Sequence, residues 1–385
     1  MKIKNRNKSS NVPNLRFPEF EGEWKARELE EICELTSSKR IYLSEYVDNG
    51  IPFYRGKEIS ELKQNIQPKD VLYISSELYN EYKNKYGVPQ INDILITAVG
   101  TLGNVLVIKN KDPFYFKDGN LIWLKDINVE SDFLAYLLEV NKKGLELSAI
   151  GSSQKALTMV ELKKLTFSFP SKEEQNKIAT LLSLIDTRIS TQSQIIEELK
   201  SLKKTLRSNL YQQIIETEKT NKIANLLNYE QPTNYIVTNT NYSNDCSLTP
   251  VLTANKAFIL GYTNEKFGIY DKGECIIFDD FTMDLKYVDF PFKVKSSAIK
   301  ILTAKLGVNL RFIYEYLSFL KLTSTDHKRH YISEIEPMCI SLPKIEIQNN
   351  TANILSLLDK KIDLEIKQYD LLVNQKKYLL SQMFI

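Results

Sequence analysis

Glycine is scarce in this 385-residue chain, with 13 residues, and histidine occurs only twice. Few glycines argue against the glycine-rich loops that cradle nucleotide phosphates. The four cysteines have no C-x-x-C spacing and lie in apolar stretches, so we interpret them as reduced, buried small hydrophobes. There is no run of 18 apolar residues, and the polar amino-terminus lacks the apolar core of a signal peptide. We therefore expect a cytoplasmic protein without a membrane span.

The amino-acid composition allows well-packed domains. Hydrophobic residues make up 43% of the chain and aromatic residues 10%, which is enough to build hydrophobic cores. The length predicts two to three domains. Lys and Arg number 51 against 48 Asp and Glu, a net charge of +3. This mild excess of positive charge permits nucleic-acid binding but is no argument for it. Binding depends on how the charge is distributed over the surface.

An internal repeat at an offset of 173 residues organises the chain. The segment PSKEEQN at 170–176 returns as PKIEIQN at 343–349. Three further positions return without a gap, since Ala179, Leu182 and Asp186 correspond to Ala352, Leu355 and Asp359. So many coincidences at one offset indicate a duplicated segment.

Each copy of the repeat opens a long helical pattern. Apolar residues recur in steps of three and four, as in a heptad seam, over 182–210 and again over 355–383. Polar residues interrupt the two seams at equivalent places, namely Gln192 and Lys203 in the first and Glu365 and Lys376 in the second. A helix of about 40 residues is about 60 Å long. Each buried Leu or Ile contributes roughly 1.5–3 kcal/mol, so the seams need a partner. Either the two helices pair antiparallel, or each binds another protein.

The segments before the two helices are related more weakly. Residues 51–56, 93–97 and 133–137 resemble 249–254, 274–278 and 313–317. We predict an α+β protein in which two mixed α/β domains, at 1–169 and 217–342, are separated by two long antiparallel coiled-coil helices, at 170–216 and 343–385. This pseudo-two-fold internal repeat makes one chain imitate a dimer. Duplex DNA has local two-fold axes that dimeric proteins exploit. Two unlike domains would therefore read two unlike half-sites, and the helices would set the unread spacer.

Four motifs carry a resemblance to a known family. They are PNLRFPEF at 13–20 followed by Trp24, the stretch IPFYRG at 51–56, the strand pattern at 93–97 followed by GTLGN at 100–104, and Leu157-Thr158 leading through Pro170 into the repeat. With them the chain resembles the specificity subunits of type I restriction–modification systems. The second half lacks an LRFP-type entry and has Ile347 where the first has Glu174, so its docking surface is expected to differ in detail.

The resemblance implies a division of labour. Each globular domain would be a target-recognition domain that reads one half of a bipartite, asymmetric site in double-stranded DNA. The helices would also dock two methyltransferase (modification) subunits, which carry S-adenosylmethionine and methylate adenine at N6. Restriction subunits that translocate DNA with ATP and Mg²⁺ would complete the complex. The chain itself would do no chemistry and would bind no cofactor or metal.

Base reading needs side chains that hydrogen-bond to base edges, and phosphate positioning needs cations or hydroxyls. Polar loop stretches supply both kinds of group. The candidate DNA-binding residues are Lys39, Arg40, Arg55, Lys57, Ser152, Ser153, Gln154, Lys155, Thr253, Asn255, Lys256, Lys266, His327, Lys328, Arg329 and His330. Charged loops that contact only solvent have the same composition, so this alternative stays open.

Other functions fit the sequence less well. A methyltransferase reading is rejected, because Asp112-Pro113-Phe114-Tyr115 lacks the second proline of an amino-methyltransferase motif. Asp70 with 81–83 faintly resembles a nuclease site, but residues 75–86 are expected to form an exposed amphipathic helix, which makes the resemblance a coincidence. His327 and His330 lack the further ligands of a metal site. A coiled-coil adaptor or scaffold protein that binds no DNA remains the alternative that the sequence excludes least.

Overall fold

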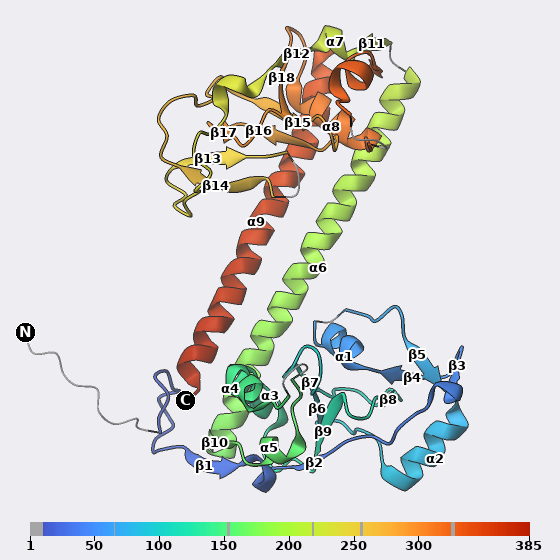
Figure 1. Cartoon of the computed structure of the whole chain (residues 1–385), viewed down its shortest axis with the longest axis vertical. Coiled ribbons are helices and arrows are strands. Elements are labelled where there is room, and N and C mark those ends of the chain that lie inside the picture. The colour runs from blue at the N-terminus through green and yellow to red at the C-terminus, as the bar shows by residue number, and fades with distance from the viewer. Residues whose placement is uncertain (1–10, 65, 152–154, 218, 255–256, 325–327) are drawn as a thin grey trace, which may run out of the picture. The chain divides into compact units, whose positions relative to one another are not determined.

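The computed structural model describes residues 11–64, 66–151, 155–217, 219–254, 257–324 and 328–385. The chain divides into two compact units, one formed by Met1–Ser193 with Gln368–Ile385 and the other by Gln194–Lys367. Each unit therefore contains one globular domain and part of both long helices, which Figure 1 labels α6 and α9. Across the described ranges, no helix has the length and apolar character that crossing a membrane requires.

The first unit contains two four-stranded sheets. One has the order β2 (Glu34–Thr36), β9 (Leu121–Lys125), β6 (Ile94–Thr97) and β7 (Val105–Val107), with antiparallel neighbours throughout. The other has the order β3 (Tyr46–Val47), β5 (Leu72–Ile74), β4 (Ile51–Tyr54) and β8 (Tyr115–Phe116), and only β4 and β8 run parallel. A further pair joins β1 (Lys25–Glu28) to β10 (Thr166–Phe169).

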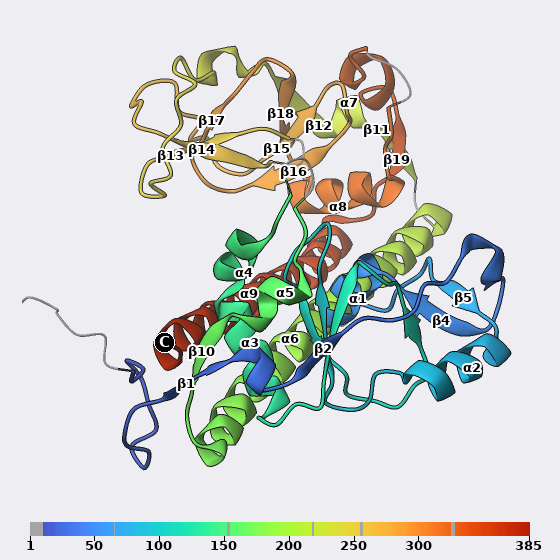
Figure 2. The same ribbon diagram turned by 60° about the horizontal axis from the view of Figure 1, so that its bottom comes forward.

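Short helices cover these sheets. They are the 3₁₀ turns η1 (Leu29–Glu31) and η2 (Leu43–Glu45) and the helices α1 (Gly56–Lys63), α2 (Ser76–Tyr86), α3 (Ser131–Val140), α4 (Lys142–Ser148) and α5 (Met159–Lys163). Tyr79 of α2 packs in one core with Phe53 of β4 and Ile74 of β5, and Figure 2 shows α2 beside these strands.

The second unit repeats this design. One sheet has the order β12 (Leu227–Glu230), β18 (Ile299–Ala304), β15 (Cys275–Asp279) and β16 (Leu285–Val288), all antiparallel. The other has the order β14 (Ile259–Thr263), β13 (Thr249–Leu252) and β17 (Lys293–Val294), with β13 and β17 parallel. The pair β11 (Thr220–Lys222) and β19 (Cys339–Ser341), the helices α7 (Ile223–Leu226) and α8 (Leu310–Leu320), the 3₁₀ turn η3 (Pro232–Tyr235) and the π-helical turn η4 (Tyr331–Ile335) complete it.

The central strands β6 and β15 read as continuous apolar runs because both of their faces are buried. Side chains on successive strand residues point to opposite faces. Ile94 and Ile96 accordingly join one hydrophobic core of the first unit, whereas Leu95 between them joins another. In the second unit Ile276 and Ile277 divide in the same way between two cores. The two strands therefore occupy one position in a repeated fold, but the predicted match of 93–97 with 274–278 is wrong by one residue. Leu95 corresponds to Ile277 rather than to Ile276, because successive strand residues face opposite cores.

The long helices α6 (Lys172–Thr217) and α9 (Ile345–Met383) pair antiparallel within each unit. In the first unit Leu182 near the start of α6 shares a core with Met383 at the end of α9. In the second unit Tyr211 near the end of α6 shares a core with Leu355 near the start of α9. The predicted internal pairing of the two seams is thus confirmed.

Two lysines that interrupt the seams form ion pairs between these helices. Lys376 Nζ of α9 lies 2.8 Å from Asp186 Oδ1 of α6 in the first unit. In the second unit Lys203 Nζ of α6 lies 2.6 Å from Asp359 Oδ2 of α9. The four residues are two pairs of repeat equivalents, so each repeat supplies the lysine of one ion pair and the aspartate of the other.

The conserved spacing within the repeat also explains how each long helix is attached to its domain. The Gln175 amide donates to the Pro170 carbonyl at 2.9 Å and accepts the Glu130 N–H at 3.0 Å, at the start of α3. Gln348 does the same in the second copy, donating to Pro343 at 2.8 Å and accepting from Asn309 at 2.9 Å, at the start of α8. Both glutamines are buried, and their doubly satisfied amides fix the long helix against the domain helix.

Candidate nucleic-acid interface

Two of the predicted DNA-binding stretches meet where the parallel strands β4 and β8 end. Arg55 and Lys57 follow β4 directly, and Lys117, whose N–H donates to the Tyr54 carbonyl at 2.9 Å, follows β8. The segment before Lys39 lies along the same end of β8, because the Ser38 hydroxyl donates to the Phe116 carbonyl at 2.6 Å. We call this end of the sheet, with Lys39, Arg40, Lys57, Lys117 and Lys155, the first basic edge.

Lys155 belongs to this edge through the backbone of its neighbour. Ala156 forms a β-bridge with Val99. A Cβ on Gly56 would lie 3.9 Å from the Val99 carbonyl oxygen, so the turn that begins α1 lies against the same residue. Lys39, Arg40, Lys57, Lys117 and Lys155 are all exposed, as phosphate contacts require. The predicted residues Ser152, Ser153 and Gln154 lie outside the described residues.

Arg55 has a structural partner beside this edge. Its guanidinium forms an ion pair with Glu58, whose carboxylate also accepts the Arg55 N–H at 2.7 Å. The Glu58 side chain is 1% exposed, whereas the Arg55 side chain is 33% exposed. The hydrogen bond with Glu58 raises the pKa of Arg55, although burial opposes the shift. Arg55 therefore compensates a buried charge and keeps part of its guanidinium at the surface.

The second unit builds the corresponding edge with different side chains. Thr253 follows β13, and Lys295, whose N–H donates to the Leu252 carbonyl at 3.1 Å, follows β17. Lys295 therefore occupies the place of Lys117, and Thr253 that of Arg55. Lys295, Lys328 and Arg329 are exposed, and we call them the second basic edge. Lys266 is also exposed, on the loop after β14.

Backbone hydrogen bonds fix how the two units correspond at the loops before η4 and α5. The Leu157 N–H donates to the Ala98 carbonyl at 2.9 Å, and the His330 N–H donates to the Asp280 carbonyl at 3.0 Å. His330 thus occupies the position of a core leucine, and Lys328 occupies that of Lys155. The predicted match between these two stretches holds in space, with Lys328 and Arg329 rather than His330 as the exposed cations.

Two predicted contacts are corrected by burial. His330 is 1% exposed, with its ring nitrogens 2.9 Å from the Ser324 hydroxyl and 3.1 Å from the Glu334 carboxylate, so a direct DNA contact by His330 is wrong for this structure. Thr253 is also buried, with 8% of its surface exposed, so the predicted base contact by its side chain is disfavoured in this structure. Asn255, Lys256 and His327 lie outside the described residues.

Two lysines completely buried in the second domain serve the fold. Lys300 Nζ lies 3.3 Å from Asp280 Oδ2, and both side chains are almost fully buried. Lys293 Nζ lies 2.9 Å from Glu265 Oε2 and donates to the Phe267 carbonyl at 2.8 Å. Burial alone would raise the pKa of Glu265, but hydrogen bonds from Thr238, Lys293 and Asn239 together lower it to about 2. Because they are buried and paired, these two lysines cannot contact DNA phosphates.

Lys117 and Lys295 are the candidates that sequence reasoning missed. Their equivalence rests on the parallel pairing of β4 with β8 and of β13 with β17, which are two-residue pairings too short to recognise in the sequence. The sequence signal is weak, because Lys117 follows an apolar pair in YFK at 115–117, whereas Lys295 follows only Val294 in KVK at 293–295. Within the described parts of the chain, there is no group of three or more metal-ligating side chains.

The duplicated α+β fold with a basic edge on each copy defines a class of two-domain recognition proteins, and comparisons with known proteins identify the family. The model of the type I restriction modification DNA specificity domain matches residues 21–201 and 211–373. The chain therefore belongs to the family of type I restriction–modification specificity proteins. Its two matched regions each contain one basic edge.

Relatives agree with this assignment. A specificity subunit of a type I restriction enzyme from Escherichia coli is 39% identical over 168 residues, which are 38% of this chain and 41% of the relative. A putative specificity subunit from Haemophilus influenzae is 32% identical over 42% of this chain and 40% of the relative. The alignments thus span about two fifths of these relatives. A putative specificity subunit from Methanocaldococcus jannaschii is 24% identical over 97% of this chain and 96% of the relative.

The fold also has a solved counterpart. A crystal structure of a type I restriction–modification S subunit from M. genitalium superposes with a TM-score of 0.69 and 16% identity, covering 97% of this chain and 99% of that chain. At this identity the likeness concerns the fold, and it extends over both domains and both long helices.

Proposed function

We propose that this chain is the DNA-reading subunit of a type I restriction–modification complex, in which each domain recognises one half of a bipartite, asymmetric site in double-stranded DNA. The observation that carries the proposal is the repetition of one basic edge in two DNA specificity domains of unlike sequence. Lys117 and Lys295 are kept at equivalent positions, whereas Arg55 is replaced by Thr253. Common cations would contact phosphates, which are alike everywhere. The partly exposed Arg55, whose counterpart Thr253 is buried, would give the first edge a base contact that the second edge lacks.

The long helices would set the unread spacer and bind the other subunits. On α9, Leu357, Leu364 and Leu371 recur every seven residues and are 65%, 61% and 70% exposed. An apolar stripe at heptad spacing is a surface that another helix covers in a coiled coil. The partners would be two methyltransferase subunits that carry S-adenosylmethionine, together with restriction subunits that use ATP and Mg²⁺. Catalysis would reside in these partners, and this chain would bind no cofactor.

Methylome sequencing of cells with and without the gene tests the proposal directly. A split, asymmetric motif methylated at adenine N6 should disappear with the gene and return when it is supplied again. A methylome that does not change would contradict the proposal.

A gel shift over a range of salt concentrations separates DNA reading from the adaptor alternative. Phosphate contacts release counterions, so affinity for DNA should fall steeply as salt rises. A chain that binds no DNA even together with the methyltransferase subunits would instead be an adaptor.

A further inference from the structure

Two side chains with large apolar surfaces, Tyr42 and Leu43, protrude from the first domain shortly after its basic residues Lys39 and Arg40. Tyr42 is 61% exposed and Leu43 is 86% exposed. Burying a leucine side chain contributes roughly 1.5–3 kcal/mol of free energy, and folding does not bury this one. A leucine this exposed therefore remains available to a ligand.

The turn that carries these side chains is anchored on both sides. Ile41 before it is 7% exposed in the domain core, and the ring of Tyr46 after it packs on Phe53 with centroids 5.4 Å apart. Within the turn η2, the Glu45 carboxylate accepts the Tyr42 N–H at 2.6 Å, and the Glu45 N–H donates back to the Tyr42 carbonyl at 3.0 Å. The fold holds the protruding pair in place, so little ordering would be needed when it binds.

Exposed cations of the first basic edge precede the turn, beside the carboxylates of Glu45 and Asp118. Arg40 Nε lies 3.0 Å from Asp118 Oδ2, next to Lys117, and the Arg40 side chain remains 68% exposed. Lys39 Nζ lies 5.0 Å from the ring centroid of Tyr86 on α2. Apolar groups bordered by exposed cations complement DNA, whose bases are apolar on their faces and methyl groups and whose backbone is anionic.

We propose that Tyr42 and Leu43 form the apolar base contact of the first recognition domain. Leu43 enters a groove of the half-site and packs against base atoms, while Lys39 and Arg40 hold the flanking phosphates. Apolar side chains of DNA-binding proteins contact thymine methyl groups or enter base steps in this manner. This inference rests on the proposed function and deepens it, since it assigns base reading to contacts of apolar surface in addition to hydrogen bonds with base edges.

The test compares two exposed leucines in the complex of the full chain with its methyltransferase subunits. Leu43→Ala removes the proposed contact. Leu306→Ala removes a fully exposed leucine after β18, a strand that begins next to the second basic edge and runs away from it. Affinity is measured for a duplex carrying the motif found by methylome sequencing and for the same duplex with the first half-site scrambled.

A base contact and a phosphate contact change these affinities differently. Leu43→Ala should weaken binding to the motif roughly tenfold, equivalent to about 1.4 kcal/mol, and leave binding to the scrambled duplex and the salt slope unchanged. Leu43→Met should retain most of the specificity because it keeps an apolar side chain of similar volume. Leu306→Ala should behave as the unaltered chain on both duplexes.

Three results would overturn the inference. They are an unchanged ratio of the two affinities in Leu43→Ala, an equal loss on both duplexes, or the same loss in Leu306→Ala. If the unaltered complex does not distinguish the two duplexes, the proposed function itself fails, and the inference fails with it. Melting temperatures equal to that of the unaltered chain exclude a folding defect as the cause of any loss.

Discussion

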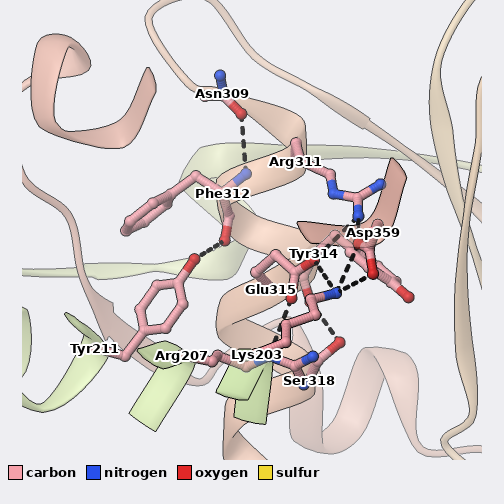
Figure 3. Close-up of polar contacts among 10 residues, drawn as sticks. All are labelled: Lys203, Arg207, Tyr211, Asn309, Arg311, Phe312, Tyr314, Glu315, Ser318 and Asp359. Atoms are coloured by element: carbon pink, nitrogen blue, oxygen red, sulfur yellow. Dashed lines mark hydrogen bonds and ion pairs between the residues drawn. The ribbon is translucent and has the colours of Figure 1, made fainter. Parts of the chain in front are cut away.

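Lys203 of α6 and Glu315 of α8 form an ion pair at 3.0 Å in the second unit, and the glutamate side chain is completely buried. Figure 3 shows that this contact belongs to a cluster in which Arg207 and Arg311 also approach Glu315, and Lys203 and Arg311 approach Asp359. The cluster joins the domain helix α8 to both long helices. Three cations thus share two carboxylates, of which only Glu315 has no exposure to water.

Removing the charge of Glu315 should destabilise the second unit strongly. Glu315→Gln leaves Lys203 and Arg311 with Asp359 alone and removes the carboxylate that Arg207 pairs with. Breaking a buried ion network by removing one partner costs about 3–5 kcal/mol. Urea unfolding measures the free energy, with Glu346→Gln as the control, because Glu346 is exposed on α9 and should change stability by less than about 0.5 kcal/mol. Equal midpoints for the two variants would show that the network contributes nothing.

The same cluster shows how far the sequence could predict the fold. The repeat located Lys203, Lys376, Asp186 and Asp359 as equivalent positions, because heptad spacing is local and readable. The repeat could not predict the contact with Glu315. This residue is 112 positions from Lys203 in the sequence, and only the packing of α8 brings the two together. His330 shows a different limit. The 173-residue offset aligns it with Leu157, but a histidine within a basic stretch gives no sign in the sequence that its side chain is buried.

Arg55 should have separable effects on folding and on DNA reading. Arg55→Ala leaves Glu58 buried without its cation, so both stability and methylation should fall. The double variant Arg55→Ala with Glu58→Gln removes the unpaired charge and should recover most of the stability. Thermal unfolding and methylome sequencing follow the two effects. If methylation returns together with stability in the double variant, Arg55 does not contact DNA.

Acid should destabilise the second unit partly through Glu265. Its pKa is about 2 in the folded protein, below the ordinary value of 4.5 for a glutamate. A depressed folded pKa contributes stability above pH 4.5, and this contribution is lost as pH falls from about 4.5 towards 2. Melting temperatures of the unaltered chain and of Glu265→Gln should therefore differ most near neutral pH, and the difference should shrink as pH falls from about 4.5 towards 2. A difference that is constant with pH would rule out this role for the Glu265 carboxylate.

Lys117 and Lys295 should contribute affinity without sequence preference. Each Ala substitution removes one phosphate contact, so affinity should fall by a similar factor for motif and scrambled duplexes, and the salt slope should decrease by about 0.9 per contact. Lys204→Ala is the matched control, since Lys204 is an exposed lysine on α6. Substitutions that change only the preference between duplexes would instead make these lysines base readers.

The spacer between half-sites should follow the length of the long helices. Inserting seven residues at equivalent places in α6 and α9 keeps the heptad seam in register and adds about 10.5 Å to each helix. At 3.4 Å per base pair, the unread gap in the methylated motif should lengthen by about three base pairs, while both half-sites stay the same. A seven-residue insertion in α6 alone is the control, because it shifts Lys203 out of register with Asp359 and should lower stability. Methylome sequencing reads the gap directly. An unchanged gap with an intact seam would mean that the helices do not determine the spacing.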